Sequence, residues 1–165
     1  MNKRVRGNNG ILPVECINQW SNKYRVRWDI RPDDTNPSLV TFVEQEFNHR
    51  PTIDEIKAVV LAWHNEQIDQ KILSGFVWRG YPVWLSTENQ FNYKAAYDLA
   101  VQSNGASLPV VFKFGTTEQP TYYQFVNLTD LSDFYLSAMS YINDTLTEGW
   151  RTKDAIDWSQ WEQYL

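Results

Sequence analysis

The side chains best suited to nucleophilic chemistry in this chain are its single cysteine, Cys16, and its two histidines, His49 and His64. A histidine beside a thiol can remove the thiol proton and so produce a nucleophile. The three residues are far apart in the sequence, so no local motif pairs them. An isolated cysteine is commonly a small packed side chain, and an isolated histidine is commonly a partly exposed one. A small cytoplasmic hydrolase that uses Cys16 with His49 or His64 therefore ranks only as our second alternative for the function of this protein.

Two carboxylates, Glu44 and Glu46, form the other candidate pair. Their spacing puts both on one face of a strand, and glycosidases use two carboxylates about 5–10 Å apart. A solvated outer face of a sheet is the commoner reason for such a pair. The chain also contains no P-loop, dinucleotide fingerprint, nucleophile elbow or HExxH motif. We therefore predict that the protein is not an enzyme and that it uses no metal and no cofactor.

Composition narrows the class of partner. The chain has 165 residues, of which 15% are aromatic, and its net charge is −5. This acidic balance argues against general nucleic-acid binding, which needs a basic surface. No apolar run approaches the ~20 residues of a transmembrane helix, and no apolar run of the signal-peptide type follows the basic start. We therefore expect a globular protein, of one domain or two small lobes, that binds neither nucleic acid nor membrane.

Residues 76–93 carry the clearest structural pattern, which predicts a β-hairpin followed by a helix. Aromatic and aliphatic side chains alternate on both sides of a central turn, as in two short strands. Gly80 can adopt the positive φ that a two-residue hairpin turn requires. Thr87 and Gln90 have the spacing of a capping box, which opens a helix. The residues that we expect to form the structural core of this hairpin are Trp78, Gly80 and Trp84.

The hairpin and the elements after it resemble a small domain of unknown function. That domain recurs in tailed-bacteriophage and prophage proteins, often near tail-fibre and tail-assembly genes. The matching positions are Trp78, Gly80, Val83, Trp84, Leu85, Ser86, Glu88 and Gln90. The resemblance covers residues 73–157, and this chain has Arg79 where the family prefers Asn. It implies a place in a phage or prophage particle, and the family has no established active site to transfer.

The remaining pattern predicts an α+β fold in which antiparallel strands and two β-hairpins pack against three main helices. The expected strands are residues 14–18, 24–30 and 39–47, in a meander, and the second hairpin covers residues 108–126. The expected helices are residues 52–73, 88–103 and 129–148, followed by a short C-terminal helix after a break at Gly149. We divide the chain into a flexible basic arm (1–10), a strand meander with its helix (11–73) and a hairpin-helix-hairpin-helix domain (74–165).

Both ends of the chain are candidate partner-facing segments. The arm is basic and has too few apolar residues to fold alone, and the last segment repeats tryptophan at helical spacing. The candidate interface residues are Lys3, Arg4, Arg6, Trp150, Trp158, Trp161 and Leu165. For the C-terminal tryptophans, the alternative is that they belong to the core of their own domain.

These patterns predict a non-catalytic structural or assembly component of a tailed bacteriophage or prophage particle, in the tail, tail-fibre or connector region. It would act by protein–protein docking with other phage or prophage structural proteins, and with copies of itself. We expect it in the virion, and in the host bacterial cytoplasm during assembly. The first alternative is a carbohydrate- or surface-binding module, because exposed tryptophan and tyrosine rings can stack on sugars.

Overall fold

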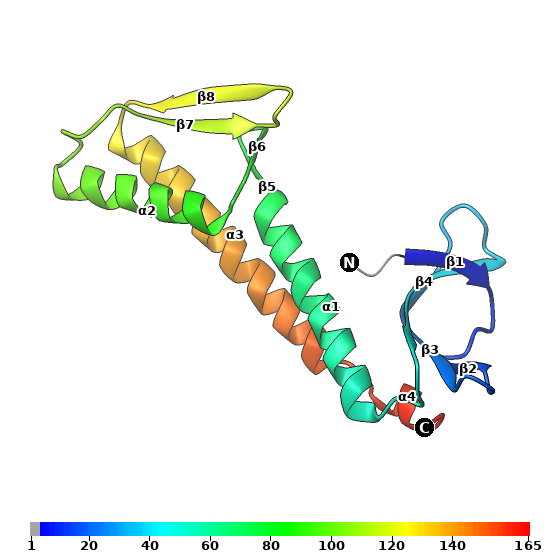
Figure 1. Cartoon of the computed structure of the whole chain (residues 1–165). Helices are drawn as coiled ribbons and strands as arrows, with labels where there is room; N and C mark the ends of the chain where they lie inside the picture. The colour runs from blue at the N-terminus through cyan, green and yellow to red at the C-terminus, as the bar shows by residue number, and fades with distance from the viewer. Residues whose placement is uncertain (1–3) are drawn as a thin grey trace. The chain divides into compact units, whose positions relative to one another are not determined.

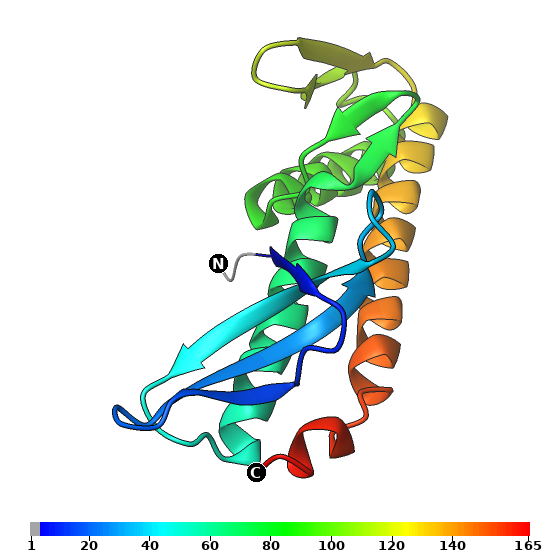
Figure 2. The same cartoon turned by 90° about the vertical axis from the view of Figure 1, so that its right-hand side faces the viewer.

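A computed structural model describes residues 4–165 and has the predicted α+β fold (Figure 1, Figure 2). Within these residues, the strands form antiparallel sheets and there are three main helices. The strands are β1 (Arg4–Asn8), β2 (Val14–Asn18), β3 (Lys23–Pro32), β4 (Leu39–Phe47), β5 (Phe76–Trp78), β6 (Tyr81–Val83), β7 (Val110–Gly115) and β8 (Pro120–Phe125). The helices are α1 (Ile53–Ser74), α2 (Thr87–Gln102), α3 (Leu128–Asp154) and the short α4 (Ser159–Glu162).

The chain forms two compact units whose boundaries fall inside α1 and α3. The sheet unit consists of Met1–Asn65 and Lys153–Leu165, and the hairpin unit consists of Glu66–Thr152. We predicted one boundary after residue 73 and assigned the whole C-terminus to the second domain. The division differs because the C-terminal segment packs into the core of the sheet unit, where Trp161 is buried.

The sheet unit contains a four-stranded antiparallel sheet with strand order β1-β4-β3-β2 (Figure 2). The predicted meander of β2, β3 and β4 is present. The prediction of a flexible arm over residues 1–10 is wrong for β1, which pairs with β4 from Arg4 opposite Val43 to Asn8 opposite Leu39. Backbone pairing along an existing edge orders a strand without apolar side chains of its own.

The core of the sheet unit is built on one face of the sheet by the first turns of α1 and the C-terminal segment. Its buried side chains are Val14, Val26, Trp28, Val43, Ile56, Val60 and Trp161. The predicted capping box opens α1: the N–H of Thr52 donates to Glu55 Oε2 over 2.8 Å, and the N–H of Glu55 donates to Thr52 Oγ1 over 3.3 Å. The box gives partners to two N–H groups at the start of the helix.

In the hairpin unit, β5 and β6 form the predicted hairpin around Arg79 and Gly80. Both residues have positive φ, 46° and 86°, as a type I′ turn requires. The Arg79 guanidinium lies 2.5 Å from Asp130 and 2.8 Å from the Tyr123 hydroxyl group. It also lies over the ring of Trp78, 4.7 Å from the centroid. These contacts offset the cost of positive φ at Arg79 and tie the turn to β8 and to the start of α3.

Helix α2 begins one residue earlier than predicted, because Ser86 is its N-cap. Ser86 Oγ accepts a hydrogen bond of 3.2 Å from the N–H of Asn89. The side-chain N–H of Gln90 instead donates to the Leu85 carbonyl oxygen over 2.7 Å. The predicted capping box of Thr87 with Gln90 is therefore wrong, although the helix and its capped start are present.

Aromatic rings fill the core of the hairpin unit around Phe134, in α3. Figure 1 shows α2 and the β7–β8 hairpin at the end of this unit where α3 begins. The rings within 6.4 Å of the Phe134 ring centroid include those of Phe76, Trp78, Tyr93, Phe112, Phe114 and Phe125. These rings come from α2 and from both hairpins, so one side chain joins the elements of the unit.

Helix α3 continues through Gly149, where we predicted a break. A Cβ atom at this position would lie 2.3 Å from Ile68 Cδ1 of α1, which is closer than van der Waals contact allows. The glycine therefore allows the two helices to approach each other closely. Beside it, the Lys71 ammonium lies 2.6 Å from the Glu148 carboxylate.

Candidate functional site

The basic residues near the N-terminus, predicted to face a partner, form ion pairs inside the sheet unit. Arg4 pairs with Asp29, and Arg6 Nε lies 2.7 Å from Asp33 Oδ2. Lys3, the third basic residue of the prediction, lies outside the described residues. In the structure, Arg4 and Arg6 therefore fasten β1 to the sheet through carboxylates that lie on or just after β3.

Asp33 should make the sheet unit sensitive to acid. Its carboxylate accepts hydrogen bonds from the Thr35 hydroxyl group and from the N–H groups of Thr35 and Asn36, and also pairs with Arg6. These bonds, that of the Thr35 hydroxyl first, lower the Asp33 pKa from 3.8 to about 2. Because the pKa of Asp33 is lower in the folded protein than in the unfolded chain, its ionised carboxylate stabilises the folded sheet unit. This contribution to the free energy of unfolding is present above pH 3.8 and is lost as the pH falls toward 2.

An NMR titration of the carboxyl carbons measures this pKa directly. We expect an Asp33 pKa of about 2 in the natural protein and a higher pKa in Thr35→Val, which lacks the hydroxyl donor. An Asp33 pKa at the ordinary value, or the same pKa in both proteins, would contradict this account of the loop.

The predicted C-terminal stripe does not form one surface. Trp161 is 2% exposed and its Nε1–H donates to the Arg27 carbonyl oxygen over 3.0 Å. Trp158 and Leu165 pack against the same core, whereas Trp150 belongs to α3 and is 54% exposed. The prediction of a partner-facing C-terminal helix is therefore wrong for Trp161. This side chain belongs instead to the core of its own unit, which was the alternative.

The candidate nucleophile and its bases have separate surroundings. Cys16 is an exposed free thiol on β2. His49 Nε2 lies 2.8 Å from Glu55, and the ring of His64 lies against that of Trp63, where burial lowers its pKa. Within residues 4–165, no hydrogen bond joins Cys16 to either histidine.

The candidate carboxylate pair is engaged by arginines. Glu46 Oε1 accepts a hydrogen bond of 2.6 Å from Arg25, and this bond lowers the pKa of Glu46. Glu44 Oε2 lies 3.3 Å from Nε of Arg27, a side chain that is itself buried and also binds Glu15. A carboxylate with a lowered pKa stays ionised at neutral pH, whereas a general acid must carry a proton.

An apolar stripe on the outer face of α2 is a feature that the sequence interpretation missed. Phe91 is 71% exposed and Leu99 is 56% exposed, and the exposed Ala95 lies between them. Their spacing of i, i+4 and i+8 puts all three on one face of the helix. We call these three residues the α2 stripe. The spacing was visible in the sequence, but it does not say which face of a helix is covered.

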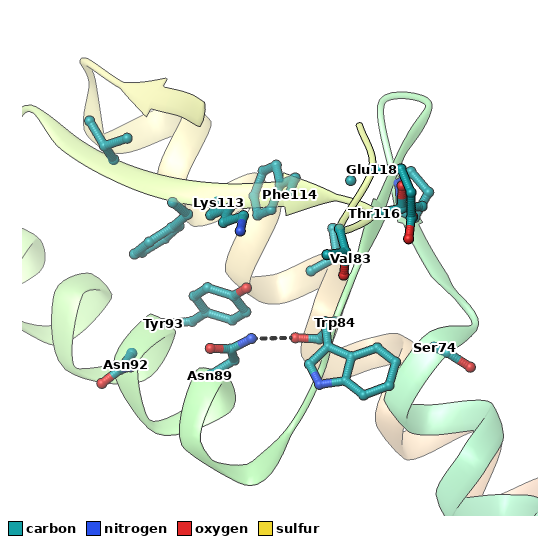
Figure 3. A pocket seen from close by; sticks show the side chains of 15 residues that line it. Ser74, Val83, Trp84, Asn89, Asn92, Tyr93, Lys113, Phe114, Thr116 and Glu118 are labelled. Carbon is teal, nitrogen blue, oxygen red and sulfur yellow. Dashed lines mark hydrogen bonds between the residues drawn. The ribbon is translucent and has the colours of Figure 1, made fainter. Parts of the chain in front are cut away.

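A pocket of about 720 Å³ lies in the hairpin unit, between α2 and the strands β6 and β7 (Figure 3). Trp84, directly after β6, lines it and is 51% exposed. The prediction that Trp84 packs in the hairpin core with Trp78 is therefore wrong. Trp78 is buried, whereas Trp84 lies between the buried Val83 and Leu85 and points to the opposite side. Gly80, in the turn, is exposed.

The pocket combines apolar walls with a few polar groups. Its polar side chains include Asn89 and Asn92 from α2, Lys113 from β7 and Glu118 from the β7–β8 loop (Figure 3). Tyr93 forms part of the wall, and its hydroxyl group points into the pocket. Burial raises the pKa of Tyr93 to about 12, so this group is a hydrogen-bond donor at neutral pH.

Comparisons of the chain with known protein families, curated proteins and solved structures find no match. The resemblance to the phage-associated domain stays a prediction. Within the described residues, no helix is long and apolar enough to cross a membrane, and no three His, Cys, Asp or Glu side chains gather where they could hold a metal ion.

Proposed function

We propose that this protein is a non-catalytic structural or assembly component of a tailed bacteriophage or prophage particle, in the tail, tail-fibre or connector region. It acts by docking onto another structural protein of the particle. The resemblance of the hairpin to a phage-associated domain supports the class of particle, and the α2 stripe supports the mode of action.

The α2 stripe is the observation that carries this proposal. Large apolar side chains held on one side of a helix lose contact with water when a partner covers them, at about 25 cal/mol per Å² of apolar surface. Aromatic side chains such as Phe91 also contribute disproportionately to protein interfaces. A ridge of residues at i, i+4 and i+8 is the pattern with which a helix fits an apolar groove. The partner is therefore expected to present an apolar groove to α2.

Substitution of Phe91 by glutamate should abolish docking and leave the fold intact. The side chain is 71% exposed, so its replacement should change the free energy of unfolding by no more than about 0.5 kcal/mol. A charge buried in an apolar groove without a counterion is strongly unfavourable. The measurement is genetic complementation: a phage or prophage whose gene for this chain is deleted is supplied with each variant, and complete particles are counted.

Asn143→Glu is the matched control, because it adds the same charge to an exposed polar position of α3 in the same unit. The natural protein and Asn143→Glu should restore particle formation, whereas Phe91→Glu should not. Complete particles in the absence of the gene, or full rescue by Phe91→Glu, would count against the proposed function.

A further inference from the structure

We propose that the pocket between α2, β6 and β7 is a binding site for a neutral saccharide. This inference does not depend on the proposed function, because the pocket and the α2 stripe are different surfaces with different residues. At about 720 Å³ the pocket falls within the range of small-molecule sites, which is roughly 300–1,000 Å³.

The hydroxyl group of Tyr93 is the first observation that points to a ligand. Tyr93 is 3% exposed, its ring packs 4.6 Å from that of Phe112, and its hydroxyl group points into the pocket (Figure 3). Within residues 4–165 this hydroxyl group has no hydrogen-bond partner. The hydroxyl oxygen is not among the buried side-chain atoms that lack a partner, so it reaches the space of the pocket and is free to bond to a molecule there. A ligand oxygen atom in the pocket could accept a hydrogen bond from this hydroxyl group in place of water.

Trp84 is the second observation, because its exposed indole offers an aromatic surface at the same pocket. A tryptophan ring adjacent to hydrogen-bonding groups suits a ligand that has an apolar face and a polar edge. Asn89 lies beside it and donates its side-chain N–H to the Trp84 carbonyl oxygen over 2.8 Å. That bond leaves the amide oxygen of Asn89 as an acceptor at the pocket wall.

The charges of the pocket favour a neutral ligand. Lys113 and Glu118 contribute one charge of each sign, and neither forms an ion pair within the described residues. A phosphate or carboxylate ligand would instead call for clustered cations or aligned backbone N–H groups. A saccharide hydroxyl group both donates and accepts, so it can bond to the tyrosine hydroxyl, the asparagine amides and both charged groups.

An extended peptide fits the pocket less well. A peptide binds a strand edge through backbone hydrogen bonds, and Pro82 on β6 has no N–H to contribute. β7 already pairs with β8 along one edge, so only its other edge could receive a peptide strand. The pocket is therefore better suited to bind a saccharide ring through its side chains than to bind a peptide strand through backbone hydrogen bonds.

The test is saturation-transfer NMR and calorimetry on the full chain with maltotriose, cellotriose and N,N′,N″-triacetylchitotriose, each at up to about 10 mM, a concentration suited to millimolar dissociation constants. At least one of these neutral trisaccharides should bind. Trp84→Ala should then weaken its affinity about tenfold, through loss of the aromatic surface. Tyr93→Phe should weaken it about fivefold, through loss of one hydrogen bond.

Trp20→Ala is the matched control, because this side chain is fully exposed in the sheet unit and its loss should leave the affinity unchanged. Tyr93→Phe should not lower the melting temperature, since it removes a hydroxyl group that has no hydrogen-bond partner among residues 4–165, so weaker binding cannot be attributed to unfolding. Absence of binding to all three trisaccharides would overturn the proposal. Binding that Trp84→Ala leaves intact, or saturable binding of an extended peptide in the same pocket, would also overturn it.

Discussion

Replacing Trp161 by alanine should lower the free energy of unfolding by about 3–5 kcal/mol, the usual cost of truncating a buried tryptophan. Its side chain is 2% exposed and packs with Trp28 and Ile56 in the core of the sheet unit. The substitution also removes the indole N–H that donates a hydrogen bond to the Arg27 carbonyl oxygen, and this buried oxygen loses that partner. The C-terminal segment, which holds only the short α4, would lose its largest buried side chain.

Chemical denaturation of the variant measures this effect, with Trp20→Ala as the control in the same unit. Trp20 is fully exposed, so its loss should change the stability by no more than about 0.5 kcal/mol. If Trp161→Ala were as stable as the control, the C-terminal segment would not be part of the core, and its tryptophans would again be candidates for an interface.

Replacing Phe134 by alanine should destabilise the hairpin unit by a similar amount, about 3–5 kcal/mol. Phe134 is fully buried and its ring contacts rings from α2 and from both hairpins. A cavity at this position would leave several rings without a neighbour on one side, and edge-to-face pairs such as that with Trp78 would be lost.

Phe91→Ala is the control for this variant, because it removes the same side chain from an exposed position of the same unit. We expect Phe134→Ala to unfold at a clearly lower denaturant concentration and Phe91→Ala to unfold at the concentration of the natural protein. Equal midpoints for the two variants would mean that Phe134 is not the centre of the aromatic core.

Local sequence patterns predicted most of the secondary structure. The bounds of β2 and β4 agree with those predicted, and the hairpin around Gly80 and the capping box of α1 are present. Each of these features depends on residues that are close together in the sequence, such as Thr52 and Glu55. Alternation, turn residues and caps therefore suffice for them.

Long-range contacts account for the main errors. β1 consists of Arg, Val, Gly and Asn and shows no apolar alternation. It is ordered by backbone pairing with β4 and by ion pairs such as Arg6 with Asp33, 27 positions away. The pocket gathers residues from Ser74 to Glu118, so no single motif marks it. Trp84 and Trp161 are the same type of residue, but one is half exposed and the other is buried. Only the packing of distant elements decides between those outcomes.

The measurement that tests the docking account most directly is site-specific photo-crosslinking from position 91 during particle assembly. A benzophenone amino acid replaces Phe91 in one protein and the exposed Asn143 in the other, and crosslinked peptides are sequenced by mass spectrometry. We expect position 91 to crosslink to one defined site on another structural protein of the particle and position 143 not to do so. No crosslink from position 91, or the same crosslinks from both positions, would contradict it.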